Sequence, residues 1–154
     1  MIQVCEHDFD IGLEYENIRE ASGDAGAIVT FSGLVREFCH PGTESMKSIT
    51  SLLLEHYPGM TEKALQKIES DARERWDLLD IRIIHRVGLL KPQDQIVFVG
   101  TASAHRVAAF ESASFIMDFL KSNAPFWKKE NDNGEGEWVQ SRDTDAQALR
   151  RWSV

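Results

Sequence analysis

The sequence has few cysteines and no long apolar run, and each shortage excludes a class of protein. Two cysteines, Cys5 and Cys39, are too few for a disulfide framework. Their spacing fits no zinc motif, and the adjacent pair Cys39-His40 lacks the further ligands of a metal site. No apolar run approaches the roughly 20 residues that cross a bilayer, and the opening MIQVCEHDFD lacks the features of a signal peptide. We expect a reduced, cytoplasmic protein with no metal and no organic cofactor.

Positive charge is also scarce, with 17 basic against 25 acidic side chains and a net charge of −8. Such a surface repels a nucleic-acid backbone unless a basic patch overrides it. One short stretch, from His105 to Lys129, reverses this balance. Its cations are Arg106, Lys121, Lys128 and Lys129, and its anions are Glu111 and Asp118. A compact anionic ligand fits this stretch better than a long polyanion.

The length and composition are typical of one globular domain, which we predict to span residues 1–154. The 17.5 kDa chain is 42% apolar and 27% charged. A domain of this length buries roughly 70% of its unfolded surface, which is enough for a hydrophobic core.

The pattern of apolar residues predicts interleaved strands and helices. In the first half we expect a strand at Ile2–Cys5, a helix capped by Asp10 and ending near Glu20, a buried strand at Ala27–Val35, an exposed loop at Arg36–Lys47 and a strand at Ile49–Tyr57. Pro58-Gly59 predicts a turn, and Thr61 is a candidate cap for a helix that buries Leu65, Ile68 and Ala72.

The second half is predicted to begin with a hairpin-like pair of strands, Ile81–Val87 and Gln95–Ala102. A helix at Arg106–Leu120 follows, with an apolar face of Ala109, Ala113, Ile116, Met117 and Leu120, and Pro125 prevents its continuation. Strands at Phe126–Glu130 and Glu137–Gln140 flank a turn at Asn131–Gly136, and Asp143 or Thr144 caps a last helix ending near Arg151. The predicted class is α+β, two-layer, with mostly antiparallel pairing.

Four segments place polar or cationic groups beside apolar structure. The strand TFSGLVRE delivers Phe31 and Arg36 to its end, although this segment alone favours a core strand that ends in a solvated arginine. SAHR places His105 and Arg106 at a helix N-terminus, which attracts phosphate. The alternative there is a Ser N-cap with two surface side chains.

The third segment, KSNAPFWKKE, holds Lys121 and Lys128 on either side of Pro125. The aromatic pair Phe126-Trp127 suggests a pocket wall, and desolvation by such a wall makes a lysine usable as an acid or base. The alternative for Lys121 is a cation that complements the helix dipole. A weaker fourth segment, GEWVQSR, is expected to pack Trp138 and project Arg142.

Several motifs together resemble the large, catalytic subunit family of molybdopterin synthase. They are HYPGMTEKAL, IHRVG, FVGTASAHR, FIMDFLK, APFWKKE and GEWV, in this order, and the likeness runs from about Gly26 to Trp152. The resemblance implies an α/β hammerhead-like fold with a small additional β subdomain. It also implies a sulfurtransferase that converts cyclic pyranopterin monophosphate to molybdopterin.

The same resemblance implies partners and residue roles. Sulfur arrives as a thiocarboxylate on the C-terminal Gly-Gly of a small ubiquitin-like subunit, and the large subunit forms a homodimer within a heterotetramer. Lys121 and Lys128 match the family's catalytic lysines. The positions that match its substrate pocket are Phe31, Arg36, His105, Arg106, Met117 and Arg142, the last reaching the neighbouring protomer.

Two other functions are considered. A non-catalytic module that docks a ubiquitin-like tail needs apolar walls and one cation, so the several cations disfavour it. A nucleotide-binding domain is disfavoured because the sequence has neither a P-loop nor G-x-G-x-x-G.

Overall fold

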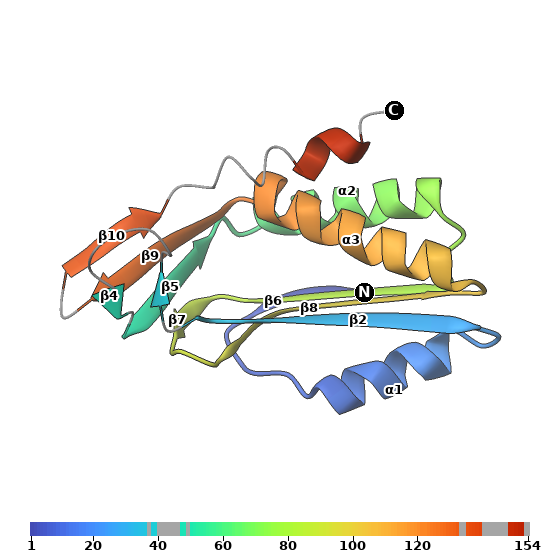
Figure 1. The fold of residues 1–154 in the computed structure, drawn as a ribbon, viewed down its shortest axis with the longest axis horizontal. Coiled ribbons are helices and arrows are strands. Elements are labelled where there is room, and N and C mark those ends of the chain that lie inside the picture. Colours follow the sequence, from blue (N-terminus) through green and yellow to red (C-terminus); the bar gives the residue numbers. More distant parts are fainter. Residues whose placement is uncertain (37, 40–46, 49, 133–134, 140–147, 153–154) are drawn as a thin grey trace.

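The computed structural model describes residues 1–36, 38–39, 47–48, 50–132, 135–139 and 148–152. In Figure 1 a central sheet lies between one helix on its lower face and two helices on its upper face. A second, smaller sheet stands at the left end of the central sheet. No helix among the described residues is long and apolar enough to cross a membrane.

The central sheet has the strand order β1-β6-β8-β2. β1 runs parallel to β6, and the other two pairings are antiparallel, which confirms the predicted pairing of the two central strands. Its strands are β1 (Ile2–Cys5), β2 (Ala27–Leu34), β6 (Asp80–Arg86) and β8 (Gln95–Ser103). The prediction of a buried strand at Ala27–Val35 is wrong in its burial. β2 is an edge strand that leaves Thr30, Phe31 and Leu34 exposed.

Three helices cover the central sheet, and they bury its apolar side chains. They are α1 (Ile11–Ala21), α2 (Met60–Arg75) and α3 (Arg106–Asn123). α2 and α3 pack on one face, where Leu65, Ile68 and Ala72 join a cluster with Phe115 and Ile116. α1 packs Ile18 against the opposite face.

The observed N-caps of α1 and α2 confirm one cap prediction and contradict the other. Asp10 caps α1 as predicted, because its carboxylate accepts a hydrogen bond of 3.0 Å from the Leu13 N–H. Thr61 does not cap α2, which begins one residue before it. Gly59 occupies the cap position with φ 81°, and the Glu62 carboxylate accepts from its N–H at 2.6 Å.

The second sheet has the order β10-β9-β5-β7, and all its pairings are antiparallel. Its strands are β5 (Ser51–His56), β7 (Gly88–Leu90), β9 (Phe126–Asp132) and β10 (Glu135–Val139). Leu52, Leu54, Leu90 and Val35 form its buried cluster. β7 was not predicted, and the β9–β10 strands extend into the segment predicted as the turn Asn131–Gly136.

Two predicted segments fall partly outside the described residues. Within the predicted loop Arg36–Lys47, β3 (Phe38–Cys39) pairs with β4 (Lys47–Ser48), so this segment is not loop throughout. At the C-terminal end the 3-10 helix η1 (Arg150–Trp152) packs Trp152 against Trp76 and Phe115. The candidate caps Asp143 and Thr144 lie outside the described residues.

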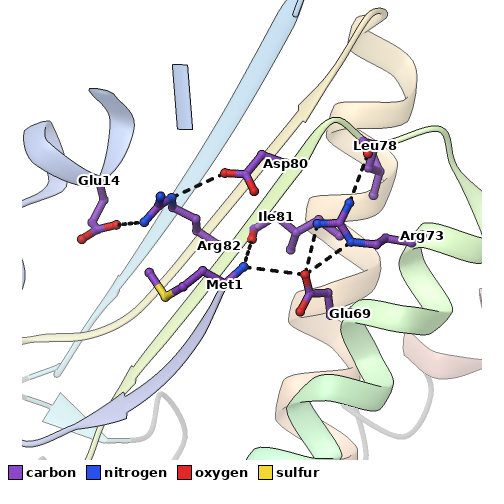
Figure 2. Close-up of polar contacts among 8 residues, drawn as sticks. All are labelled: Met1, Glu14, Glu69, Arg73, Leu78, Asp80, Ile81 and Arg82. Atoms are coloured by element: carbon purple, nitrogen blue, oxygen red, sulfur yellow. Dashed lines mark hydrogen bonds and ion pairs between the residues drawn. The ribbon is translucent and has the colours of Figure 1, made fainter. Parts of the chain in front are cut away.

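Ion pairs tie α1 and α2 to the central sheet (Figure 2). Arg82 on β6 lies 3.1 Å from Glu14 of α1 and 3.5 Å from Asp80. On α2, the Glu69 carboxylate pairs with Arg73 at 3.1 Å and with the Met1 amino group at 3.6 Å. The α+β class with mostly antiparallel sheets and a small extra β unit is confirmed. The sheet and the α2–α3 pair form the expected two layers, and α1 adds a layer on the opposite face.

Candidate active site

The two lysines predicted to be catalytic lie on either side of one turn. Lys121 is exposed in the last turn of α3, and Lys128 is exposed on β9. α3 ends at Asn123, just before Pro125, which has no backbone N–H for another helical hydrogen bond. The Phe126 N–H donates to the Ala124 carbonyl at 2.9 Å, and the chain passes directly from helix to strand.

A hydrogen bond from Thr61 of α2 holds this turn in place. Its side chain is fully buried, and its hydroxyl donates to the Pro125 carbonyl at 3.2 Å and accepts from the Tyr57 N–H at 3.1 Å. One hydroxyl therefore joins the end of β5, the first turn of α2 and the turn between the two lysines. The residue predicted to cap α2 instead supports the candidate site.

Lys128 shares a strand face with buried apolar residues. It pairs with Leu54, which is 1% exposed, and Phe126 two residues earlier pairs with His56. Trp127 lies on the opposite face of β9 and is 45% exposed. The predicted wall of both aromatic rings is therefore wrong, because successive side chains of a strand point to opposite faces. Phe126 alone lies on the same face as Lys128.

His85 on β6 is a site residue that the sequence reasoning did not single out. Its ring stacks on Phe126 with centroids 3.8 Å apart and planes inclined by 17°. Burial is the main cause that lowers the pKa of His85 to about 4; the bond to the Arg86 carbonyl opposes this shift, and the charges of Lys128 and His56 add to it. His85 is therefore neutral at pH 7 and lies within electrostatic reach of Lys128.

His56 connects this cluster to α2. Its Nε2 lies 3.6 Å from a Glu62 oxygen, and the other Glu62 oxygen accepts from Gly59. The lysine cluster, which we define as Lys121, Lys128, His56, His85 and Phe126, thus contains elements from both sheets and the end of α3. Met117 lies one helical turn before Lys121 and is partly buried against the main core.

His105 and Arg106 lie at the opposite end of α3. His105 is the N-cap residue without a side-chain cap bond, and both side chains are exposed. Ser103 is therefore not the cap; its hydroxyl donates to the Asp77 carbonyl at 2.9 Å and accepts from the His105 N–H at 3.4 Å. At 1.5 Å per residue, Arg106 and Lys121 are about 22 Å apart along the helix. Within one chain, the length of α3 therefore separates the His105-Arg106 pair from Lys121.

Phe31 and Arg36, which were predicted from the TFSGLVRE strand, lie at different distances from the lysine cluster. Phe31 pairs with Val99 in the middle of β8 and is 42% exposed. Arg36 is exposed beyond Leu34, which pairs with Gln95 at the end of the sheet where His85 pairs with Val97. The strand register therefore places Arg36 on the side of the lysine cluster. Arg142 lies outside the described residues.

Among the described residues, no group of three or more His, Cys, Asp or Glu side chains is placed to hold a metal ion. Cys5 is a free thiol, and burial raises its pKa. His40, the second member of the Cys39-His40 pair, lies outside the described residues.

These features define the class of protein as an α+β subunit with a lysine cluster where a helix, a small sheet and a central sheet meet. The family model described as MoaE protein matches residues 4–123. The "Molybdopterin synthase catalytic subunit" of Ralstonia nicotianae is 49% identical over 99% of this chain and 84% of the relative. The protein of the same name from Escherichia coli K12 is 50% identical over 98% of this chain and 97% of the relative.

Solved structures agree with these relatives. The "Molybdopterin biosynthesis MoaE protein" of Burkholderia ambifaria superposes with a TM-score of 0.84 at 45% identity, covering 100% of this chain and 98% of the other. Molybdopterin synthase from Staphylococcus aureus superposes with a TM-score of 0.79 at 28% identity, covering 89% and 95%. The chain belongs to the MoaE family of molybdopterin synthase catalytic subunits, which confirms the resemblance and the assignment to a sulfurtransferase-type enzyme of molybdopterin synthesis.

Proposed function

We propose that this chain transfers sulfur to cyclic pyranopterin monophosphate, taking it from the C-terminal thiocarboxylate of a small ubiquitin-like subunit. The observation that carries the proposal is the pair of exposed lysines on either side of a pinned turn, with Lys128 beside the apolar cluster of the second sheet. The thiocarboxylate sulfur attacks a precursor carbon, and the oxygen on that carbon leaves as water after protonation. A water molecule then attacks the carbonyl of the resulting thioester, and the oxyanion that forms collapses, which leaves the sulfur on the pterin and a carboxylate on the small subunit. The Lys128 ammonium stabilises that oxyanion most strongly where water is partly excluded. Lys121 supplies a second cation and a proton for the departing oxygen.

The substrate phosphate needs a cationic site of its own. Arg36 on the side of the lysine cluster and the His105-Arg106 pair at the start of α3 provide guanidinium and imidazole donors suited to phosphate. A single pterin monophosphate is much shorter than α3, so it does not span from Lys121 to Arg106 within one chain. This separation supports a site completed by a second copy of the chain.

We place the contact between copies at the free edge of the central sheet. β2 is an edge strand, and it exposes Phe31 and Leu34 at 42% and 49%. The adjacent first turns of α3 expose Val107 and Phe110 at 58% and 63%. Exposed apolar side chains along an unpaired strand edge and on the helix beside it favour association with another strand edge. A two-fold contact there lies next to the His105-Arg106 pair, and Arg142 is expected to contribute to the neighbouring site.

A reconstitution with purified chain, thiocarboxylated small subunit and pyranopterin precursor tests the reaction. Dithiolene product is measured after oxidation to its fluorescent form. We expect Lys128→Ala to lower turnover by roughly 10²-fold or more, with an unchanged circular dichroism spectrum. Lys129→Ala is the matched control, because it removes the same charge from the opposite face of β9, and it should retain activity within about threefold. Full turnover by Lys128→Ala would exclude the assigned role.

Mixing two inactive variants tests the shared site. If each site combines the lysines of one copy with the His105-Arg106 pair of the other, a mixed Lys128→Ala and Arg106→Ala dimer holds one intact site. Random exchange of subunits then restores about a quarter of wild-type turnover, because half of the dimers are mixed. No restoration, with exchange verified by native mass spectrometry, would contradict the shared site and leave the lysine assignment intact.

A further inference from the structure

His85 lies where the packing of the core calls for an apolar side chain. Side chains alternate along β6, and Ile81 and Ile83 on the same face are 0% exposed in the main core cluster. His85 continues that column at 9% exposure and pairs with Val97 of β8. A buried imidazole costs desolvation that a leucine or valine in this position would avoid. Its presence therefore needs a reason other than core packing.

Two contacts fix the orientation of the ring. One face stacks on Phe126 at 3.8 Å, and Nδ1 lies 2.9 Å from the Arg86 carbonyl oxygen. A carbonyl oxygen only accepts, so Nδ1 carries the proton and donates it. The imidazole is thereby held parallel to a ring that belongs to the other sheet.

The stack of His85 on Phe126 joins β6 to β9, the strand that carries Lys128. Phe126 is the first residue of β9, and Lys128 follows it two residues later on the same face. We infer that His85 is a positioning residue for Lys128, which acts by holding the Phe126 ring and with it the direction in which β9 leaves the α3 turn. The inference rests on the proposed function, because it assigns His85 to the same reaction.

The charges around His85 agree with this role. Lys128 faces it from β9 and His56 faces it from β5, while Glu62 of α2 lies 3.6 Å from His56. Burial keeps the pKa of His85 low, so the ring adds no positive charge next to the Lys128 ammonium at neutral pH. A permanently cationic residue at this position would repel that ammonium.

The test compares three variants in the reconstituted complex. His85→Ala removes the stack, His85→Phe keeps an aromatic ring against Phe126, and Ile81→Val trims the same face of β6 at its far end as the matched control. We expect His85→Ala to lower kcat at least tenfold while KM for the precursor stays within about twofold, because a small displacement of a catalytic group acts on the chemical step. His85→Phe should recover most of kcat, and Ile81→Val should keep wild-type kcat.

A second readout does not depend on turnover. The reactivity of Lys128 toward acetic anhydride is followed across pH by peptide mass spectrometry, and its midpoint should move in His85→Ala and return toward wild type in His85→Phe. Equal kcat losses in His85→Ala and Ile81→Val, or an unmoved midpoint, would overturn the inference. If wild type makes no product, the proposed function fails. If Lys128→Ala abolishes turnover and His85→Ala does not, only the role of His85 fails.

Discussion

The central sheet and the second sheet use similar strands but differ in how they are covered. Helices pack on both faces of the central sheet, and β8 is buried without interruption from Val97 to Ser103. The second sheet buries a single small cluster around Leu52, Leu54 and Leu90. The central sheet therefore supplies most of the stability, and the thinner second sheet leaves room for Lys128 beside its apolar cluster. Under the proposed function, stability and chemistry therefore belong to different parts of one fold.

The largest expected effect comes from the core of the central sheet. Phe98→Ala removes a side chain that is 0% exposed and packs against Phe9 and Ile18, so the free energy of unfolding should fall by about 3–5 kcal/mol. Urea unfolding measures this loss. In Phe98→Ala, backbone amide hydrogen exchange should accelerate in both sheets. Leu54→Ala is the counterpart in the second sheet, and it should accelerate exchange mainly in β5 and β9. Equal effects of Leu54→Ala on both sheets would refute the comparison.

The next effect concerns acid stability at the junction of the two sheets. The folded pKa of His85 is about 4, below its ordinary value of 6.5. As pH falls through 6.5 the unfolded chain takes up this proton first, so the free energy of unfolding decreases until pH reaches about 4. The shift corresponds to about 3 kcal/mol.

The free energies of unfolding of wild type and His85→Phe at pH 7 and pH 4 measure this contribution of His85. Other groups that titrate in the range affect both proteins alike, so the difference between them isolates His85. His85→Phe should lose about 3 kcal/mol less than wild type between the two pH values. A parallel decline of both proteins would show that His85 is protonated in the folded state without cost.

The smallest effect distinguishes two buried threonines. Thr61→Val leaves the Pro125 carbonyl and the Tyr57 N–H without their partner, which should cost about 1–3 kcal/mol and also lower turnover. Thr101→Val in the central sheet loses its hydrogen bond of 2.8 Å to the Ala109 carbonyl. It should cost a similar amount of stability with unchanged kcat. Loss of turnover in both variants at equal stability would remove the functional distinction between the sheets.

Local signals in the sequence predicted most of the fold. Asp10 predicted the start of α1, and the alternation of apolar residues predicted β6 and β8 as a pair. The position of β2 at an edge was not predictable, because its apolar side chains read the same whether one neighbour or two pair with the strand. β7 was missed because three residues are too short for a period-2 pattern.

The site was less predictable than the fold, because its contacts join residues far apart in the chain. The motifs placed Lys121 and Lys128 on either side of Pro125, and the structure describes both there. The stack of His85 on Phe126 crosses from one sheet to the other, and a lone histidine in an apolar strand gives no sign of it. Arg106 and Lys121 are far apart because α3 begins at Arg106 and ends just after Lys121. In the sequence both residues belong to one motif-rich stretch, which does not show this separation.

The irregular end of β2 bears on how far the edge of the central sheet can pair with a strand of another chain. The pairing register of β2 with β8 shifts between Gly33 and Leu34. Gly33 pairs with Val97 and Leu34 pairs with Gln95, so the extra residue of this bulge is Ile96 on β8. The stronger local twist at a bulge shortens the straight backbone edge of β2 that another chain can extend. An outer strand with exposed Phe31 and Leu34 is otherwise a template for amyloid-like growth. The shift next to Gly33 therefore limits how far another strand can extend β2, and the earlier residues of β2 form the edge at which we propose the contact between copies.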